Sequence, residues 1–446
     1  MARGLRLTRG VIWYPVNKSL WVVISPLGQG QEKCHLIERA HTAVLDFFRS
    51  ALCHHEDAIP SQMTDAVERW LSPKLAILEE VKEPRPLKDY EHLALDVFQE
   101  YRAANDLGGY HDLASYYQNK IQDPLRQFEE IETTVSHLYR ESHPALEGRS
   151  YGARFAEVLL QEGALREAGS LLEVGCGTGL FGKAFLSEVK RLASDLYKTL
   201  HYTYLDISPV LKDCQKLNNK EHGKIASFVQ GDASAGQIDE KAHDIIICNE
   251  VIADLAVIKL SRQKRKRKGL EGEAWDLVRR IGLNLSDAPP QFILNVGALR
   301  FLSNLSRALK PRGKAYIVEY GSPLSYPMSQ FITDHTEYSI HFGHLLRAAR
   351  AFGLEGTLHV LTEFLRFDPD LEVLDDLSHA ALFNHLLPFL GIEADARRVY
   401  TRPMLIQSLS EVFQRVQNLA FVPLKSLKGI AYPDGFYVLS LLKETD

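Results

Sequence analysis

Short runs of mostly apolar residues, which are typical of strands buried in a sheet, recur through the middle of the chain. They stand at residues 171–174, where Glu173 interrupts the run, at 202–205, where Thr203 does, and at 228–229 and 245–248. Between the first two runs, residues 180–189 carry apolar side chains at helical spacing. Strands that alternate with helices predict an α/β fold, a Rossmann-like sheet of mostly parallel strands with helices on both faces.

The first 84 residues have a different pattern and predict a separate module. Residues 11–14 and 20–24 are expected to form strands, and two helices are expected to follow. The apolar faces of these two helices would consist of Leu36, Ala40, Val44 and Phe47, and of Met63, Val67 and Trp70. This arrangement predicts a small winged-helix-like α+β module over residues 1–84.

Pro84 and Pro86 mark a linker, because two closely spaced prolines cannot continue a helix. We expect residues 85–150 to form a helical linker or cap, with one helix carrying Phe128, Ile131, Val135 and Leu138 on its apolar face. Tyr139, His143 and Tyr151 are candidates for lining a site. Residues 151–446 would form the main domain, with an insertion near residues 258–290 and a C-terminal helical extension.

The glycine-rich run Glu173-Val-Gly-Cys-Gly-Thr-Gly179 joins the first strand to the first helix. Glycine allows a sharp turn and a close approach of a ligand to the backbone, and the free amides at a helix N-terminus attract polar groups. A dinucleotide-binding loop has glycine at the sixth position of its motif, where this chain has Leu180. The sequence therefore predicts a cofactor site and weakens the case for NAD or FAD.

With an acidic residue two positions before the first glycine, the loop resembles motif I of class I S-adenosylmethionine-dependent methyltransferases. The resemblance implies that S-adenosyl-L-methionine is the cofactor. Asp206 ends the second strand and would bind the ribose hydroxyls, and Asp232 would face the adenine. The full set of expected cofactor-binding residues is Glu173, Gly175, Cys176, Gly177, Thr178, Gly179, Asp206, Ile207, Ser208, Asp232, Ala233 and Asn249.

Further runs resemble one branch of this superfamily, the MidA-like proteins, which include a protein arginine methyltransferase needed for complex I assembly. The matching runs lie at residues 205–215, 249–257, 316–321 and 337–342. The chain differs from that family at Thr178, Val251 and Ile252, on the side of the methyl acceptor, so the resemblance implies arginine methylation less firmly than methyl transfer. The module over 1–84 is similar to PqqD-like elements that bind leader peptides, and a lid or dimerisation domain is an equally open alternative.

Four residues are candidates for binding the methyl acceptor and removing its proton: Glu250, Asp254, Glu319 and His341. Glu250 and Asp254 are expected four positions apart at the start of a helix, on the same side. The protein would mainly orient the acceptor and exclude water, because the methyl group on a sulfonium is already activated. A structural role for His341 in the core remains equally open.

Composition limits the remaining options. The 446 residues carry a net charge of −5, so nucleic-acid binding by the whole chain is not expected. The run of five basic residues at 264–268 is expected to be a solvated loop, with an anchor for an acidic peptide as the alternative. Five cysteines without paired spacing predict reduced thiols in a cytoplasmic protein with no metal site. No membrane association is expected, and the sequence is compatible with a homodimer.

The sequence leaves three functions open. The leading hypothesis is methyl transfer to a side chain of a protein or peptide, with arginine as one acceptor and a leader-bearing precursor as one substrate. The alternatives are methylation of a small molecule in a biosynthetic pathway and a non-catalytic assembly factor that keeps the methyltransferase fold.

Overall fold

The computed structural model describes residues 109–119, 133–166, 168–262, 268–332 and 335–445, together with shorter stretches between residues 4 and 81. The chain divides into two compact units. The larger unit consists of Tyr101–Asp368 and Lys428–Asp446, and the smaller unit consists of Met1–Glu100 and Pro369–Leu427. The sequence assigned residues 369–427 to the C-terminal extension of the main domain, whereas the structure groups them with the N-terminal residues.

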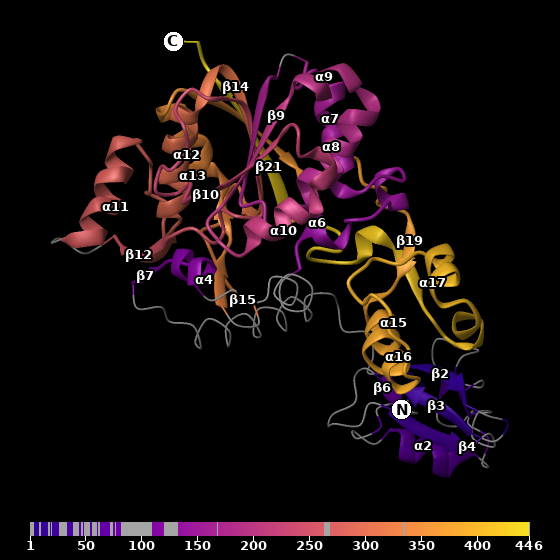
Figure 1. Cartoon of the computed structure of the whole chain (residues 1–446). Coiled ribbons are helices and arrows are strands. Elements are labelled where there is room, and N and C mark those ends of the chain that lie inside the picture. Colours follow the sequence, from indigo (N-terminus) through magenta and orange to yellow (C-terminus); the bar gives the residue numbers. More distant parts are fainter. Residues whose placement is uncertain are drawn as a thin grey trace. The chain divides into compact units, whose positions relative to one another are not determined.

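The larger unit is built on one eight-stranded sheet, which confirms the predicted α/β class (Figure 1). Its strands, in spatial order, are β10 (Ala226–Gln230), β9 (His201–Asp206), β8 (Ser170–Val174), β11 (His243–Asn249), β14 (Leu309–Ser322), β21 (Phe436–Lys443) and β18 (Leu354–Val360), and β17 (Ile340–His341) pairs with the end of β14. The first five strands are parallel, and β21 is antiparallel to both of its neighbours.

Helices cover both faces of this sheet (Figure 1). On one face, α12 (Val296–Ala308) and α13 (Phe342–Ala351) pack on Ile246, Cys248 and Ile317 in the main apolar core. The other face carries α7 (Tyr151–Gln161) and α8 (Leu180–Leu192), whose aromatic rings contact those of the sheet. These rings belong to Phe155, Phe181, Phe185, Tyr202 and Tyr316.

The central strand β11 lies between β8 and β14, as its uninterrupted apolar run predicts. Residues 245–248 are buried on both faces. From β8 the chain builds the sheet outward on one side through β9 and β10, and then returns to add β11 on the other side. Ligands of open α/β sheets bind at the carboxyl ends of the strands where the order reverses, which here is the end of β8 and β11.

An additional helix explains the long sequence between the glycine loop and Asp206. After α8 the chain forms α9 (Ser194–Thr199) before it enters β9.

The predicted insertion after β11 contains three elements. Residues 257–294 form β12 (Val257–Ser261), α11 (Gly269–Arg280) and β13 (Gln291–Leu294). Strand β12 lies between β13 and β7 (Tyr110–His111) in a small antiparallel sheet.

Parts of the predicted helical cap differ from the expectation. Val135 and Leu138 lie in the short helix α6 (Val135–Leu138), which begins after Thr134, whose side chain caps it by accepting a hydrogen bond from the His137 amide. Phe128, Ile131 and the proline linker lie outside the described residues, as do residues 264–267 of the basic run.

The smaller unit contains two three-stranded antiparallel sheets. One consists of β2 (Ile12–Pro15), β3 (Leu20–Ile24) and β4 (Cys34–Glu38), and the other of β5 (His54–His55), β1 (Gly4–Leu7) and β6 (Leu78–Val81). The two predicted strands are therefore confirmed, and so is the second helix, α2 (Thr64–Trp70), which buries Val67 and Trp70. The prediction for the first helix is wrong at Leu36, which lies in β4 and pairs with Val22.

Strands β2 and β3 share their core with the segment from the C-terminal part of the chain. Ile12, Val22 and Ile24 pack with residues of α15 (Asp376–Ala381) and α17 (Arg402–Arg415). The backbone of Trp13 also exchanges two hydrogen bonds with that of Gln417. These contacts explain why residues 369–427 belong to this unit. In the described part of the whole chain, no helix is long and apolar enough to cross a membrane.

Candidate functional site

The glycine loop follows β8 and leads into α8. Gly175, Gly177 and Gly179 all have positive φ angles, of 65°, 52° and 81°. This left-handed backbone is costly for residues with a Cβ atom, so the sequence needs glycine at these positions. The Gly175 amide donates to the Leu205 carbonyl at 2.8 Å, and the Gly179 amide donates to the Cys176 carbonyl at 2.8 Å. The loop is thereby fixed against the neighbouring strand.

Two glycines also allow close packing around the loop. A Cβ atom on Gly175 would lie 2.2 Å from a methyl group of Val251, in the segment after β11. A Cβ atom on Gly182, in α8, would lie 2.5 Å from a carboxylate oxygen of Glu173 and 2.4 Å from the Tyr204 ring. Gly177 instead faces open space, with no atom within 4 Å of its Cβ position. The backbone of Gly177 is therefore accessible to a ligand.

Three amide side chains of α10 (Leu211–Asn218) and the residue after it hold the loop carbonyls. Gln215 donates to the Gly177 carbonyl at 2.9 Å, Asn218 to that of Thr178 at 2.8 Å, and Asn219 to that of Gly179 at 3.0 Å. We did not predict these residues from the sequence. Their spacing on one helical face, directly after the Asp206 strand, is the signal that could have identified them.

Asp206 lies at the carboxyl end of β9, beside the loop. One carboxylate oxygen accepts from the Gly177 amide at 3.0 Å and the other from the Ser208 amide at 2.9 Å. Burial raises the pKa of this carboxyl to about 6, against the opposing effect of the two amide hydrogen bonds. A carboxylate that touches the loop in this position has unused lone pairs for a diol.

Glu173 and Cys176 are placed differently from the glycines. The Glu173 carboxylate is buried under α8 and accepts from the Tyr202 hydroxyl at 2.8 Å. Burial raises its pKa to about 8. The Cys176 side chain is also buried, which raises the pKa of its thiol. Both side chains therefore support the loop from the protein interior. Thr178, within the loop, is only partly buried.

Four further predicted residues lie after β9 and β10. Asp232 closes its own turn, because one carboxylate oxygen accepts from the amides of Ser234, at 2.8 Å, and Ala235, at 3.1 Å. The carbonyl of Ala233 accepts from Asn304 at 3.0 Å. Ser208 is buried, and Ile207 is partly buried. These residues lie at the same end of the parallel strands as Asp206, since β9 and β10 are parallel neighbours.

Asn249 ends β11 and connects two of the predicted residues. Its amide oxygen accepts from the Tyr151 hydroxyl at 2.8 Å, and its amide nitrogen donates to Glu250 at 3.0 Å. Tyr151 is thus the aromatic candidate that reaches the site. Tyr139 instead donates to the Ala431 carbonyl, and the His143 ring accepts from the Ala145 amide at 3.1 Å.

Glu250 has a φ angle of 53°, which is rare for a residue other than glycine. Its carboxylate accepts from the amides of Val135, at 2.9 Å, and Ser136, at 3.3 Å, and so holds the N-terminal turn of α6. Burial raises its pKa to about 7, with a smaller contribution from the charge of Glu337. The structure shows no helix at residues 250–254, so the predicted helical pairing of Glu250 with Asp254 is wrong.

Glu319 is buried in β14 and accepts from the amides of Ala253, at 3.1 Å, and Tyr320, at 3.0 Å. Its pKa is raised well above the usual range, first by burial and then by the charge of Glu250. The structure therefore places Glu250 and Glu319 close to each other, one residue beyond the paired Asn249 and Val318. Asp254 belongs to the same neighbourhood, since its charge and that of Glu319 both raise the pKa of Tyr320.

His341 lies apart from these carboxylates in its contacts. Its ring stacks on that of His344, with the centroids 3.6 Å apart, and meets Tyr326 edge-on. Burial lowers the pKa of both imidazoles. Both rings line a pocket of about 390 Å³ together with Asp287, Gly343 and Arg347. The structure therefore favours the core role for His341 that the sequence left open.

Residues 151–350 match the model of a family described as "putative S-adenosyl-L-methionine-dependent methyltransferase". The matched segment contains the glycine loop, Asp206, Asn249, Glu250 and Glu319. This segment is an S-adenosyl-L-methionine-dependent methyltransferase domain. Its cofactor is S-adenosyl-L-methionine, as the loop predicted. No curated protein matches the sequence.

Solved structures with the same kind of fold share little sequence with this methyltransferase. One is a "likely methyl transferase" from Burkholderia thailandensis bound to S-adenosyl-homocysteine, with 15% identity, 82% of this chain and 95% of that chain covered, and a TM-score of 0.45. Another is a TehB-like S-adenosylmethionine-dependent methyltransferase from Corynebacterium glutamicum, with 22% identity, 48% and 79% covered, and a TM-score of 0.27. These likenesses concern the fold alone.

The residues around the methyltransferase loop fit this cofactor. The Asp206 carboxylate can accept hydrogen bonds from a ribose diol, and the space at Gly177 leaves the loop backbone open to a ligand. The cofactor supplies a methyl group that is activated by its positive sulfur. Binding and orientation are the tasks that remain for the chain itself.

Proposed function

We propose that this chain transfers a methyl group from S-adenosyl-L-methionine to a positively charged nitrogen-bearing side chain of a protein or peptide, and that arginine is the preferred acceptor. The observation that carries the proposal is the pair Glu250 and Glu319 at adjacent strand ends. Both carboxyls have raised pKa values, and no cationic side chain is among the main contributors to either shift. A guanidinium would supply the missing positive charge.

The hydrogen bonds of the two carboxylates leave room for this role. Glu319 accepts two backbone amides, one on each oxygen, and a carboxylate offers about four lone-pair sites. A planar guanidinium matches a carboxylate with two parallel hydrogen bonds. Binding of the cation would lower both pKa values again, because an opposite charge favours the ionised form.

In the proposed reaction, Glu250 and Glu319 hold the acceptor so that its nitrogen lone pair lies in line with the methyl group. The new carbon–nitrogen bond forms while the carbon–sulfur bond breaks, and its electron pair stays on the sulfur of the departing S-adenosyl-homocysteine. The nitrogen then gives a proton to a carboxylate, from which it reaches solvent. Asn249 and Tyr151 orient Glu250 from the side.

The MidA-like resemblance and the N-terminal unit refine the proposal. We infer that the smaller unit recognises the peptide substrate, by adding a segment of it as an extra strand. The outer strand for such an addition is β4, since Gln417 covers the free side of β2 at Trp13. A leader-bearing precursor peptide fits this mode, because main-chain hydrogen bonds give affinity without a fixed sequence.

The test is methyl transfer from labelled S-adenosyl-L-methionine to three panels: arginine-containing peptides, matched lysine-containing peptides and free amines or metabolites. We expect label on the arginine panel. Glu319→Gln should lower kcat about 100-fold with little change in cofactor affinity, because the group acts on the acceptor. Glu355→Gln, on the exposed edge strand β18, is the control.

Each of the other possible outcomes contradicts one part of the proposed function. Turnover only on free metabolites would replace the peptide substrate with a small molecule. Cofactor binding without turnover on any panel would indicate a non-catalytic assembly factor. Full activity of Glu319→Gln would remove the carboxylate pair from the reaction.

A further inference from the structure

A second cluster of ligating side chains lies near the acceptor carboxylates. Asp254, His335 and Glu337 each offer one ligand atom, and these atoms lie within 4.8 Å of one another. His335 and Glu337 stand two positions apart in β16 (His335–Tyr338), so both side chains lie on the same face of the strand. Asp254 comes from the segment after β11. The Nε2 atom of His335 lies 3.1 Å from a carboxylate oxygen of Glu337.

The distances suit one metal ion. Ligand atoms that bind the same ion at about 2.1 Å lie about 3–4 Å apart, so small side-chain rotations would bring all three atoms into one shell. One imidazole and two carboxylates form a mixed nitrogen and oxygen set. Such a set suits Mn²⁺ or Zn²⁺ better than Mg²⁺, which prefers oxygen ligands and keeps several waters.

The hydroxyl of Tyr320 gives independent support. Within the described part of the chain, this hydroxyl is buried and has no hydrogen-bond partner. It lies within electrostatic reach of Asp254 and Glu337. A buried hydroxyl without a partner is costly, and a metal ion with a bound water would give it one.

The surrounding charge is negative. The charge of Glu337 also acts on Glu250 and Glu319, so four carboxylates share this neighbourhood. A divalent cation would offset this repulsion. It would also join the segment after β11 to the hairpin of β15 (Ser329–Ile332) and β16.

We propose that Asp254, His335 and Glu337 bind a divalent transition metal ion, and that this ion ties the β15–β16 hairpin to the segment that carries Glu250. The sequence predicted no metal site, because the three residues are far apart in the chain and lie in no recognised spacing. The site does not depend on the methyl transfer proposed above.

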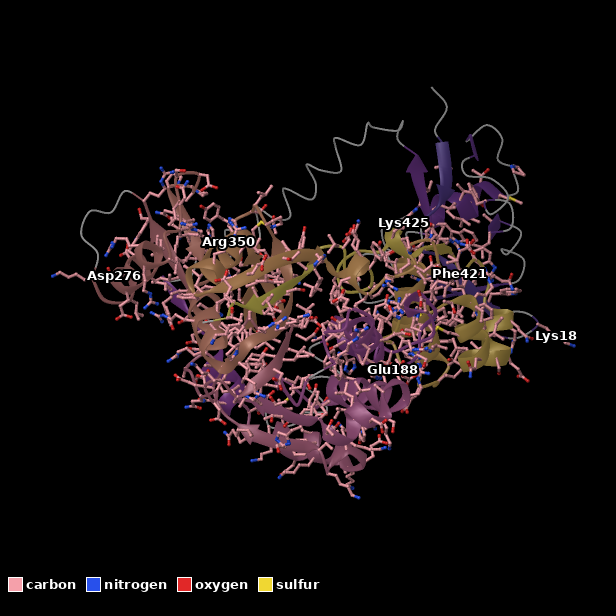
Figure 2. All side chains as sticks on the ribbon, turned by 90° about the horizontal axis from the view of Figure 1, so that it is seen from above. Lys18, Glu188, Asp276, Arg350, Phe421 and Lys425 are labelled. Carbon is pink, nitrogen blue, oxygen red and sulfur yellow. The ribbon has the colours of Figure 1, made fainter. Side chains whose placement is uncertain are left out.

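The test uses the full chain, freed of metal with a chelator and without cofactor. Titration with Mn²⁺, followed by the electron paramagnetic resonance of the free ion, should show one site per chain, and Zn²⁺ should displace it. Asp254→Asn and His335→Gln should each weaken Mn²⁺ binding at least tenfold, as expected for loss of a ligand. Asp276→Asn and His359→Gln, both at exposed positions, are matched controls; Figure 2 shows Asp276 on the outer helix α11.

A second measurement needs no variant. Pulsed resonance of bound Mn²⁺ should show coupling to one imidazole nitrogen, from His335. Binding without nitrogen coupling would place the ion on carboxylates alone and contradict the proposal. The proposal would be overturned if neither Mn²⁺ nor Zn²⁺ bound stoichiometrically. It would also be overturned if the two variants bound Mn²⁺ as tightly as the unmodified chain.

Discussion

The two halves of the site are built in different ways. On the cofactor side, backbone conformation and neutral amides define the loop: three glycines adopt left-handed angles, and Gln215, Asn218 and Asn219 bind their carbonyls. On the acceptor side, burial raises the pKa values of Glu250 and Glu319, and the charges of neighbouring carboxylates raise them further. The first half is fixed by the conformation of its loop, and in the second no cationic side chain is among the main contributors to either pKa shift. The comparison therefore sets a loop held by backbone geometry against two carboxyls whose ionisation is opposed by burial.

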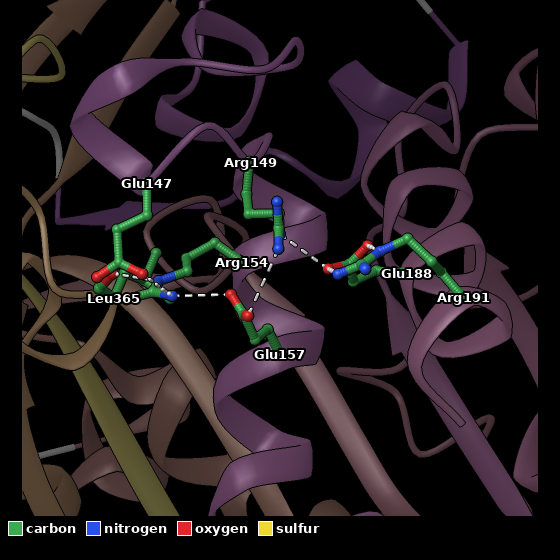
Figure 3. A network of polar contacts seen from close by, with 7 residues as sticks. All are labelled: Glu147, Arg149, Arg154, Glu157, Glu188, Arg191 and Leu365. Carbon is green, nitrogen blue, oxygen red and sulfur yellow. Dashed lines mark hydrogen bonds and ion pairs between the residues drawn. The ribbon is translucent and has the colours of Figure 1, made fainter.

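The largest effect on stability should come from the buried ion-pair network of Arg154, which lies outside both halves of the site. Arg154 of α7 is fully buried and binds the Leu365 carbonyl at 2.9 Å, Glu147 at 3.0 Å and Glu157 at 2.8 Å (Figure 3). Arg154→Met leaves Glu157 without this partner, and we expect it to lower the free energy of unfolding by about 3–5 kcal/mol. Denaturant unfolding measures this change.

The same network provides the control. Arg191 pairs with Glu188, but its side chain is 52% exposed (Figure 3). Arg191→Met should therefore cost under about 1 kcal/mol. Equal losses for the two variants would mean that burial of Arg154 does not matter. A loss of cofactor binding without a loss of stability would make Arg154 part of one half only.

The next effect tests the contact between the halves. Gly175→Ala combines left-handed strain with a clash against Val251, and we expect a cost of about 3 kcal/mol in stability. Gly177→Ala has the same strain and no clash, so about 1–2 kcal/mol is expected. Denaturant unfolding and calorimetric cofactor titration measure both. Adding Val251→Ala to Gly175→Ala should recover part of the loss; no recovery would exclude the clash.

The contrast between the halves also explains what could be predicted from the sequence. The strands, the glycine loop and Asp206 follow from local patterns, because strand burial and turn geometry depend on neighbouring residues. The loop-binding amides Asn218 and Asn219 were missed, although their spacing was visible. The helical pairing of Glu250 and Asp254 failed because Glu250 adopts a positive φ angle that ends regular structure.

Tertiary contacts account for the remaining errors and gaps. His335 and Glu337 join the acceptor side only because β16 is folded near the end of β11, which no local pattern encodes. Similarly, residues 369–427 pack with β2 and β3 across more than half of the chain. Leu36 was assigned to a helix by its spacing with Ala40 and Val44, but pairing with β3 places it in a strand.

Asp206→Asn should change the cofactor side without changing the acceptor side. The variant keeps the size of the side chain but removes the charge and one acceptor for the ribose. We expect cofactor affinity to fall about 30- to 100-fold, or about 2–3 kcal/mol, as for a hydrogen bond to a charged group. Calorimetric titration measures this loss, and Asp213→Asn, exposed beside Lys216, is the matched control. Unchanged affinity would remove Asp206 from the cofactor site.

Cofactor affinity and turnover should depend differently on pH, because the pKa values of Asp206 and Glu250 differ by about one unit. The Asp206 pKa of about 6 predicts that cofactor affinity falls about tenfold per unit below pH 6, as the carboxylate becomes protonated. The Glu250 pKa of about 7 in the free chain predicts that kcat/KM already falls below pH 7. Calorimetry and rate profiles measure the two limbs separately, and Glu250→Gln should remove only the limb near 7.

The pH dependence of the free energy of unfolding gives an independent check of the raised Glu250 pKa. Because burial raises the pKa of Glu250 above its unfolded value of 4.5, the folded chain holds this proton more tightly than the unfolded chain. Its contribution to stability is therefore complete below pH 4.5 and is lost as the pH rises through 7. Glu250→Gln should gain stability relative to the unmodified chain over this window. A constant difference between the two proteins would mean that Glu250 ionises normally, and burial of its carboxyl would then not distinguish the acceptor side.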